Sequence, residues 1–246
     1  MKTYRFLPLG ALLLLGLPAF RSAAPVGSAT TAAKEDPRRE VREVAAFTHL
    51  SLSTSAEVEV RQGASQKVEV QATPADLAEL ETVVKDGRLT IRAKDHTGMN
   101  WRSFKGPVKV FVTMPTISAL SVAGSGRMTA LDVVKNDKLK LSVSGSGRLQ
   151  VPVQAQQLTS SISGSGSMKL SGSAPAFEVH VSGSGSIQAA ELRAEAVAVH
   201  ISGSGNCQVQ ASQTLDAHIA GSGNVRYAGS PRITQHISGS GRVVRS

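Results

Sequence analysis

The chain has 246 residues and a formal net charge of +9, with 41% hydrophobic but only 4% aromatic residues and a single cysteine. This length suits one or two domains, and one cysteine excludes an intramolecular disulfide. The basic residues are scattered and do not alternate with aromatic side chains, as they would in a nucleic-acid groove, so we expect no nucleic-acid partner.

The first 24 residues have the pattern of a secretory signal peptide. Two basic residues precede an apolar run at 6–20, and small residues follow it. The run is short for a membrane span and is interrupted by proline and glycine, so an uncleaved anchor is the less favoured alternative. We therefore expect an exported protein, periplasmic, envelope-associated or secreted, with no transmembrane segment in the mature chain. Residues 25–45, rich in Ala, Pro, Ser and mixed charge, are predicted to be a flexible linker.

Residues 46–123 are predicted to form an irregular β region that caps the start of the repeats. Alternation and turn residues indicate two hairpins, one joining 56–60 to 67–70 and one joining 82–84 to 89–91. Residues 74–81 form the one plausible helical turn, with proline at its first position. A loop at 96–106 is expected to hold Trp101, the single tryptophan of the chain.

Residues 124–246 carry a repeated Gly-Ser-Gly triplet. The triplets begin at Gly124, Gly145, Gly164, Gly183, Gly203, Gly221 and Gly239, and the successive spacings are 21, 19, 19, 20, 18 and 18 residues. A period near 20 indicates a solenoid. Apolar residues alternate on both sides of each triplet, which predicts a strand before the corner and a shorter strand after it. We therefore predict an all-β fold, a single-stranded parallel β-helix of about seven coils. Cys207 falls on an inward position and is interpreted as a small core residue.

Four histidines share one register in consecutive coils. His180, His200, His218 and His236 each lie three residues before a triplet, and their neighbours are apolar. Alternation places them outward, in a ladder with a rise of about 4.8 Å per coil. Such a ladder could hold a divalent transition metal such as Zn²⁺, Cu²⁺ or Ni²⁺, or form a surface whose charge rises as pH falls. The simpler interpretation is favourable stacking of like residues, because no carboxylate lies in the row to orient a metal-bound ring.

The sequence resembles the head GIN domain family, exported bacterial proteins labelled as auto-transporter adhesins. The resemblance covers about residues 46–246 and rests on Asp-Gly-Arg-Leu-Thr-Ile at 86–91, Val-Thr-Met-Pro at 112–115, serial Ile-Ser-Gly-Ser-Gly and Tyr-Ala-Gly-Ser-Pro at 227–231. It implies a β-helical fold and an envelope or surface role, and it implies no catalytic residues.

Three functions remain open from the residues. The favoured one is a non-enzymatic adhesive or structural module that binds an extracellular or envelope polymer or protein. The second is a protein that binds a metal or an anionic ligand through the histidine ladder. The third, a polysaccharide-active enzyme, is disfavoured because the acidic residues of the repeats do not stack at one position. The last strands, which end at Ser246, are expected to leave an open edge through which the protein could form homo-oligomers.

Overall fold

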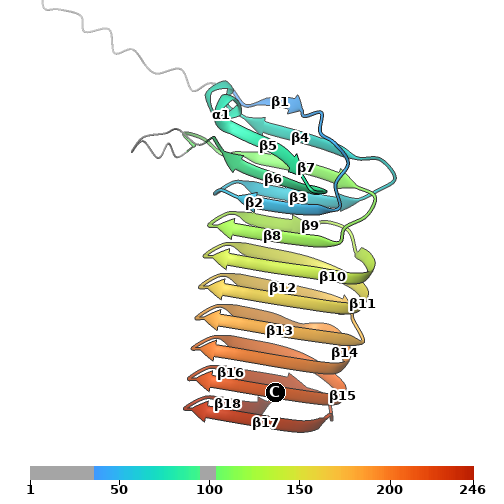
Figure 1. Ribbon diagram of the computed structural model, residues 1–246, viewed down its shortest axis with the longest axis vertical. Helices are drawn as coiled ribbons and strands as arrows, with labels where there is room; N and C mark the ends of the chain where they lie inside the picture. Colours follow the sequence, from blue (N-terminus) through green and yellow to red (C-terminus); the bar gives the residue numbers. More distant parts are fainter. Residues whose placement is uncertain (1–35, 95–103) are drawn as a thin grey trace, which may run out of the picture. The chain divides into compact units, whose positions relative to one another are not determined.

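The computed structural model describes residues 36–94 and 104–246, in which each repeat forms one coil of a parallel β-helix (Figure 1). The chain runs into each Gly-Ser-Gly corner along one face, here called face A, and leaves the corner along the other, face B. Each strand pairs in parallel with its equivalent about 19 residues along the chain. Apolar residues alternate inward from both faces and pack between them. The predicted fold of about seven coils is confirmed.

Both faces continue from the repeats into the N-terminal region. Face A follows the order β5 (Leu80–Lys85), β6 (Arg88–Ala93), β2 (His49–Ser53), β8 (Ala119–Gly124), β10 (Val134–Gly145), β11 (Arg148–Gly164), β13 (Ala176–Gly183), β14 (Ser186–Gly203), β15 (Asn206–Gly221) and β17 (Arg232–Gly239). Face B follows the order β1 (Arg38–Val41), β4 (Lys67–Ala72), β7 (Lys109–Met114), β3 (Glu57–Gln62), β9 (Arg127–Ala130), β11, β12 (Ser167–Ser173), β14, β15, β16 (Asn224–Ala228) and β18 (Arg242–Arg245). Strands β11, β14 and β15 belong to both faces because they continue through the second corner of their coils.

Both glycines of each triplet are required, the first by its backbone conformation and the second by the close stacking of the coils. The first glycine has φ between +100° and +126° in all seven triplets, a region that L side chains rarely adopt. A Cβ on the second glycine would come within 2.6 Å of an inward side chain in the preceding layer, as at Gly185, where the atom met is Ile162 Cγ2 at 2.4 Å. The serine between them continues the ladder through its backbone N–H, as from Ser165 to the Gly145 carbonyl at 2.9 Å.

The core is a narrow stack of aliphatic rows. The inward residues that flank the corners are at most 2% exposed through the sixth triplet, and Cys207 lies among them at 1%. One inner row includes two small residues, Ser160 and Ala217, both fully buried in register with Leu141, Val179 and Val199. In the last coil the row opens to solvent, since Ile237 is 39% exposed whereas Ile219, its equivalent one coil earlier, is 2% exposed.

The N-terminal region caps the stack, as predicted, but one of its expected hairpins is wrong. Strands β5 and β6 do form the antiparallel hairpin around Asp86-Gly87. In contrast, β3 and β4 are not partners, because β7 lies between them, parallel to β3 and antiparallel to β4. The alternation predicts both strands correctly, but β3 pairs with the next parallel layer rather than with its neighbour in sequence. The loop with Trp101 lies largely outside the described residues.

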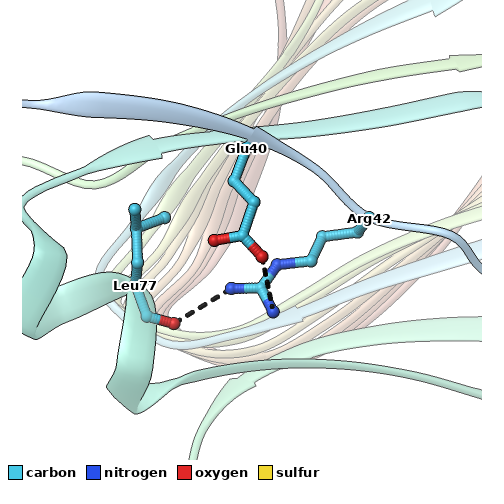
Figure 2. A network of polar contacts seen from close by, with 3 residues as sticks. All are labelled: Glu40, Arg42 and Leu77. Atoms are coloured by element: carbon cyan, nitrogen blue, oxygen red, sulfur yellow. Dashed lines mark hydrogen bonds and ion pairs between the residues drawn. The ribbon is translucent and has the colours of Figure 1, made fainter.

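Part of the expected linker belongs to the folded region. Residues 38–41 form β1, which pairs antiparallel with β4. Figure 2 shows that Arg42 extends this contact: its Nη2 donates to the Leu77 carbonyl at 3.0 Å, and its Nη1 lies 3.3 Å from Glu40 Oε1. The predicted linker is therefore wrong for residues 38–42, and its residues 25–35 lie outside the described residues.

Helix α1 (Pro74–Glu79) confirms the predicted helical turn. The hydroxyl of Thr73 caps it by accepting from the Asp76 amide at 3.2 Å. Asp76, only 3% exposed, in turn accepts hydrogen bonds from the Thr73 hydroxyl and from the backbone amides of Lys105 and Gly106, at 2.9, 2.9 and 3.0 Å. This buried carboxylate therefore ties the helix to the segment that leads into β7.

Candidate functional site

The four histidines form a stacked ladder on face A. His180, His200, His218 and His236 are direct partners in the parallel pairing of β13, β14, β15 and β17. Successive ring centroids are 5.0, 5.1 and 4.9 Å apart, and the interplanar angles are 10°, 17° and 25°. The residues before and after each ring point inward, and those of the first three coils are buried, so the predicted outward orientation is confirmed.

Carboxylates contact two of the four rings, and the expectation that none would orient them is wrong. Glu178 Oε1 lies 2.9 Å from His180 Nε2, and Asp216 Oδ1 lies 3.1 Å from His218 Nε2. The second contact is an ion-pair distance without hydrogen-bond alignment. These acids sit two residues before the histidine, and residues two apart on a strand share a face. The side chains are 43–50% exposed, so each pair contributes little to stability.

The ladder lines one wall of a groove, here called the histidine groove, with a volume of about 800 Å³. The corner side of the groove carries a second row of small hydroxyl side chains, two residues further along each strand. These are Ser144, Ser163, Ser182, Ser202 and Ser238. The two rows run across the strands, one side chain from each coil, and Ala220 interrupts the serine row between Ser202 and Ser238.

The stacked arrangement does not itself form a chelate. Two Zn–N bonds of about 2.0–2.1 Å can join nitrogens at most about 4.2 Å apart, so parallel rings about 5 Å apart would have to rotate out of the stack to share an ion. Within residues 36–94 and 104–246, no group of three or more His, Cys, Asp or Glu side chains is placed to hold a metal. The metal site at these histidines therefore stays a prediction.

A second groove, which no spacing in the sequence predicts, runs along the corners opposite the triplets. At four of these six corners a buried alanine lies between two outward residues, most of them polar, and Asn136 and Gly229 take its place at the first and last corners. The successive corners are Lys135-Asn136-Asp137, Gln154-Ala155-Gln156, Ser173-Ala174-Pro175, Arg193-Ala194-Glu195, Gln210-Ala211-Ser212 and Ala228-Gly229-Ser230. We call the resulting trough the turn groove, and its volume is about 1100 Å³.

Neither groove brings acids together as a glycosidase requires. Asp137 and Glu195 both line the turn groove, but they lie three coils apart, which is about 14 Å at the strand spacing of a sheet. Paired carboxylates in glycosidases are about 5–9.5 Å apart. Cys207 is no nucleophile either, because burial raises the pKa of its thiol to about 12.

Several solved structures share this fold. The "putative adhesin" of Bacteroides fragilis is 26% identical, with a TM-score of 0.79, and the match covers 86% of this chain and 97% of that one. A "putative lipid binding protein" of Parabacteroides distasonis is 25% identical, with a TM-score of 0.73 and coverage of 87% and 98%. A "putative adhesin" of the same organism, 24% identical with a TM-score of 0.69 and coverage of 87% and 98%, supports the fold alone.

No curated protein matches the chain significantly. None of the helices in the described part of the chain is long and apolar enough to cross a membrane. The model of one protein family matches residues 46–231, which include the cap and nearly all of the repeats. The chain belongs to this family, whose description is "Putative auto-transporter adhesin, head GIN domain".

Proposed function

We propose that this protein is an exported, non-enzymatic adhesion module that binds an extended polymer or protein of the cell envelope or its surroundings. The observation that carries the proposal is the pair of grooves that run across successive coils, each lined by outward side chains that successive coils contribute at a fixed rise. A surface of this kind suits a partner that is itself long and repetitive. The family description and the adhesin description of the Bacteroides fragilis relative support the same role.

Export is supported by the leader-like first 24 residues, and a folded stack held by aliphatic rows needs no disulfide outside the cytoplasm. N-terminal sequencing of the protein recovered from the envelope and culture fractions tests this part of the proposal. A mature N-terminus near residue 25 is the expected result. An intact Met1 in a cytoplasmic fraction would contradict it.

Adhesion is tested by immobilising the purified protein and passing solubilised envelope glycans and envelope proteins over it. We expect saturable retention of material of one class, and weaker retention when a bulky residue fills either groove, as in Ser173→Trp or Ser182→Trp. Gln188→Trp is the matched control, because this exposed residue lies on face B and lines neither groove. Absence of retention in every fraction, or equal retention by all three variants and the parent, would overturn the proposal.

A second candidate function is binding of a transition metal or of an anionic ligand at the histidine ladder. Metal binding is favoured by the stacking of four imidazoles and by the carboxylates beside His180 and His218, whereas binding of an anionic ligand is favoured by the imidazoles alone. Zinc titration followed by calorimetry and histidine NMR shifts tests it, with His200 and His218 replaced together by alanine. Micromolar binding that the double variant loses would support the site, and zinc binding equal in both proteins would exclude it.

A further inference from the structure

The turn groove has a chemistry distinct from that of the histidine groove. Its floor is formed by backbone, because the middle residues of the corners turn inward: Ala174 and Ala211 are at most 1% exposed. At the last of these corners Gly229 has φ +101°, and a Cβ there would meet the Ala211 carbonyl at 2.1 Å. Over the five corners from Ala155 to Gly229 no side chain therefore rises from the floor, and a ligand can lie directly along these coils between two rows of outward residues.

The walls of the turn groove carry hydrogen-bonding groups that are free to bind a ligand. Gln154, Gln156 and Gln210 line it, and none of these amides is bonded to another of the residues that the structure describes. A side-chain amide offers two donors and an acceptor, which matches a partner whose groups also donate and accept. Hydroxyl groups have this property, whereas carboxylates and phosphates only accept.

The charges along the groove are balanced. Lys135 and Asp137 flank one corner, and Arg193 and Glu195 flank another, so each cation is matched by an anion. A polyanion would meet as many repulsive as attractive charges here, and nucleic acid would also find no aromatic platform in the lining. A neutral ligand meets no charge repulsion.

The dimensions favour an oligomer over a small molecule. The six corners span five coil spacings, which is about 24 Å at 4.8 Å each. The volume of about 1100 Å³ slightly exceeds the range of about 300–1,000 Å³ for small-molecule pockets. An extended peptide would need unpaired backbone for strand addition. The backbone of these corners is already bonded between coils, as from the Ala174 amide to the Arg193 carbonyl and from the Glu195 amide to the Pro175 carbonyl.

We propose that the turn groove is a binding site for a neutral linear polysaccharide, held along the coils by the amides of Gln154, Gln156 and Gln210 and by neighbouring hydroxyls. The site is distinct from the histidine groove, because the two grooves share no lining residue. The inference rests on the proposed adhesion function and assigns to it a face and a class of ligand.

The test is affinity electrophoresis and calorimetry with three neutral glucans, dextran, laminarin and hydroxyethyl cellulose, and with polygalacturonate as the acidic comparator. We expect at least one neutral glucan to bind with an affinity that does not change between low and high salt. Gln154→Ala and Gln210→Ala should each weaken it about three- to tenfold, as for the loss of one hydrogen bond. Gln188→Ala, the same change on face B outside both grooves, should leave it unchanged.

Two outcomes would overturn the inference. One is binding of polygalacturonate alone with strong salt dependence, and the other is neutral-glucan binding that Gln154→Ala, Gln210→Ala and Gln188→Ala affect equally. In either case retention of envelope material in the adhesion assay would leave the proposed function standing. Loss of retention there, with melting curves that show a folded protein, would remove both.

Discussion

The corner glycines offer a test that separates two physical causes of their requirement. Gly124 and Gly164 have nearly the same backbone, with φ of +108° and +111°. A Cβ at Gly124 would have no neighbour closer than 3.9 Å, because no earlier triplet lies beneath it. A Cβ at Gly164 would lie 2.7 Å from the Gly145 carbonyl oxygen and 3.2 Å from the Gly145 nitrogen. Gly124→Ala therefore introduces backbone strain alone, and Gly164→Ala introduces the same strain and a collision with the coil below.

The expected magnitudes differ by about a factor of two. A non-glycine residue at such a φ costs about 1–3 kcal/mol of folding free energy. In both variants alanine offsets about 0.4–1 kcal/mol of this cost, because it lowers the conformational entropy of the unfolded chain. Forced displacement of a packed neighbour adds about 1–3 kcal/mol at Gly164, where it also disturbs the bond from the Ser165 amide to the Gly145 carbonyl. We expect a loss of about 1–2 kcal/mol for Gly124→Ala and of about 3–4 kcal/mol for Gly164→Ala.

Equilibrium urea unfolding, monitored by far-ultraviolet circular dichroism, measures both losses. Ser165→Ala is the matched control, because its exposed side chain lies in the same corner, and its stability should change by less than about 0.5 kcal/mol. Equal losses in the two glycine variants would show that coil stacking contributes nothing to the requirement. An unchanged stability for Gly124→Ala would refute the argument from positive φ.

Three further predictions concern single side chains. Cys207 should resist thiol reagents at pH 8 and react after unfolding in urea, because burial raises the pKa of its thiol to about 12, and labelling of the native protein at pH 8 would contradict this burial. Because the thiol of the unfolded chain loses its proton at a lower pH than the buried thiol, the contribution of Cys207 to stability is lost as pH rises above about 9. Asp76→Ala should lower the free energy of unfolding by about 3 kcal/mol, because the amides of Lys105 and Gly106 lose a buried charged acceptor. Urea unfolding measures the loss, and a loss below about 0.5 kcal/mol would show that water replaces the carboxylate as acceptor. Arg42→Ala should cost about 1 kcal/mol and speed proteolysis near β1 relative to Arg38→Ala, and equal cleavage of the two variants would show that the contact with Leu77 does not hold the strand.

Much of the fold follows from local sequence because each coil contacts only its neighbours. The alternation around Val181 and Ile201 identifies the buried side of the strands, and the triplets mark one corner of every coil. Parallel stacking at a constant offset from that corner then places His180, His200, His218 and His236 in a single row. The carboxylates of Glu178 and Asp216 could have been found in the same way, since a residue two positions earlier in a strand lies on the same face.

The cap was harder to predict because its pairing is not local. Strand β4 has the same alternation whether it pairs with β3 or with β7, so periodicity alone cannot choose between them. In the structure β3 pairs with β9 at one edge and with β7 at the other, so no edge of β3 is left for β4. Strand β1 was missed for a related reason, because its four residues are all exposed and show no apolar alternation.

By itself the sequence determined the coil, its period, the glycine corner and the outward histidine row, because these depend on repeated local patterns at a constant distance from the triplet. The turn groove was decided only by tertiary structure. The spacing between the first glycine of a triplet and the middle residue of the next turn-groove corner varies, so counting along the chain does not align these corners. The spacing is 10, 10, 11, 8 and 8 residues for Ala155, Ala174, Ala194, Ala211 and Gly229. Register shifts between β12 and β14 and between β14 and β15 absorb the differences in length. Inter-coil hydrogen bonding and burial of an alanine at four of the corners, rather than sequence spacing, bring the polar rows into line.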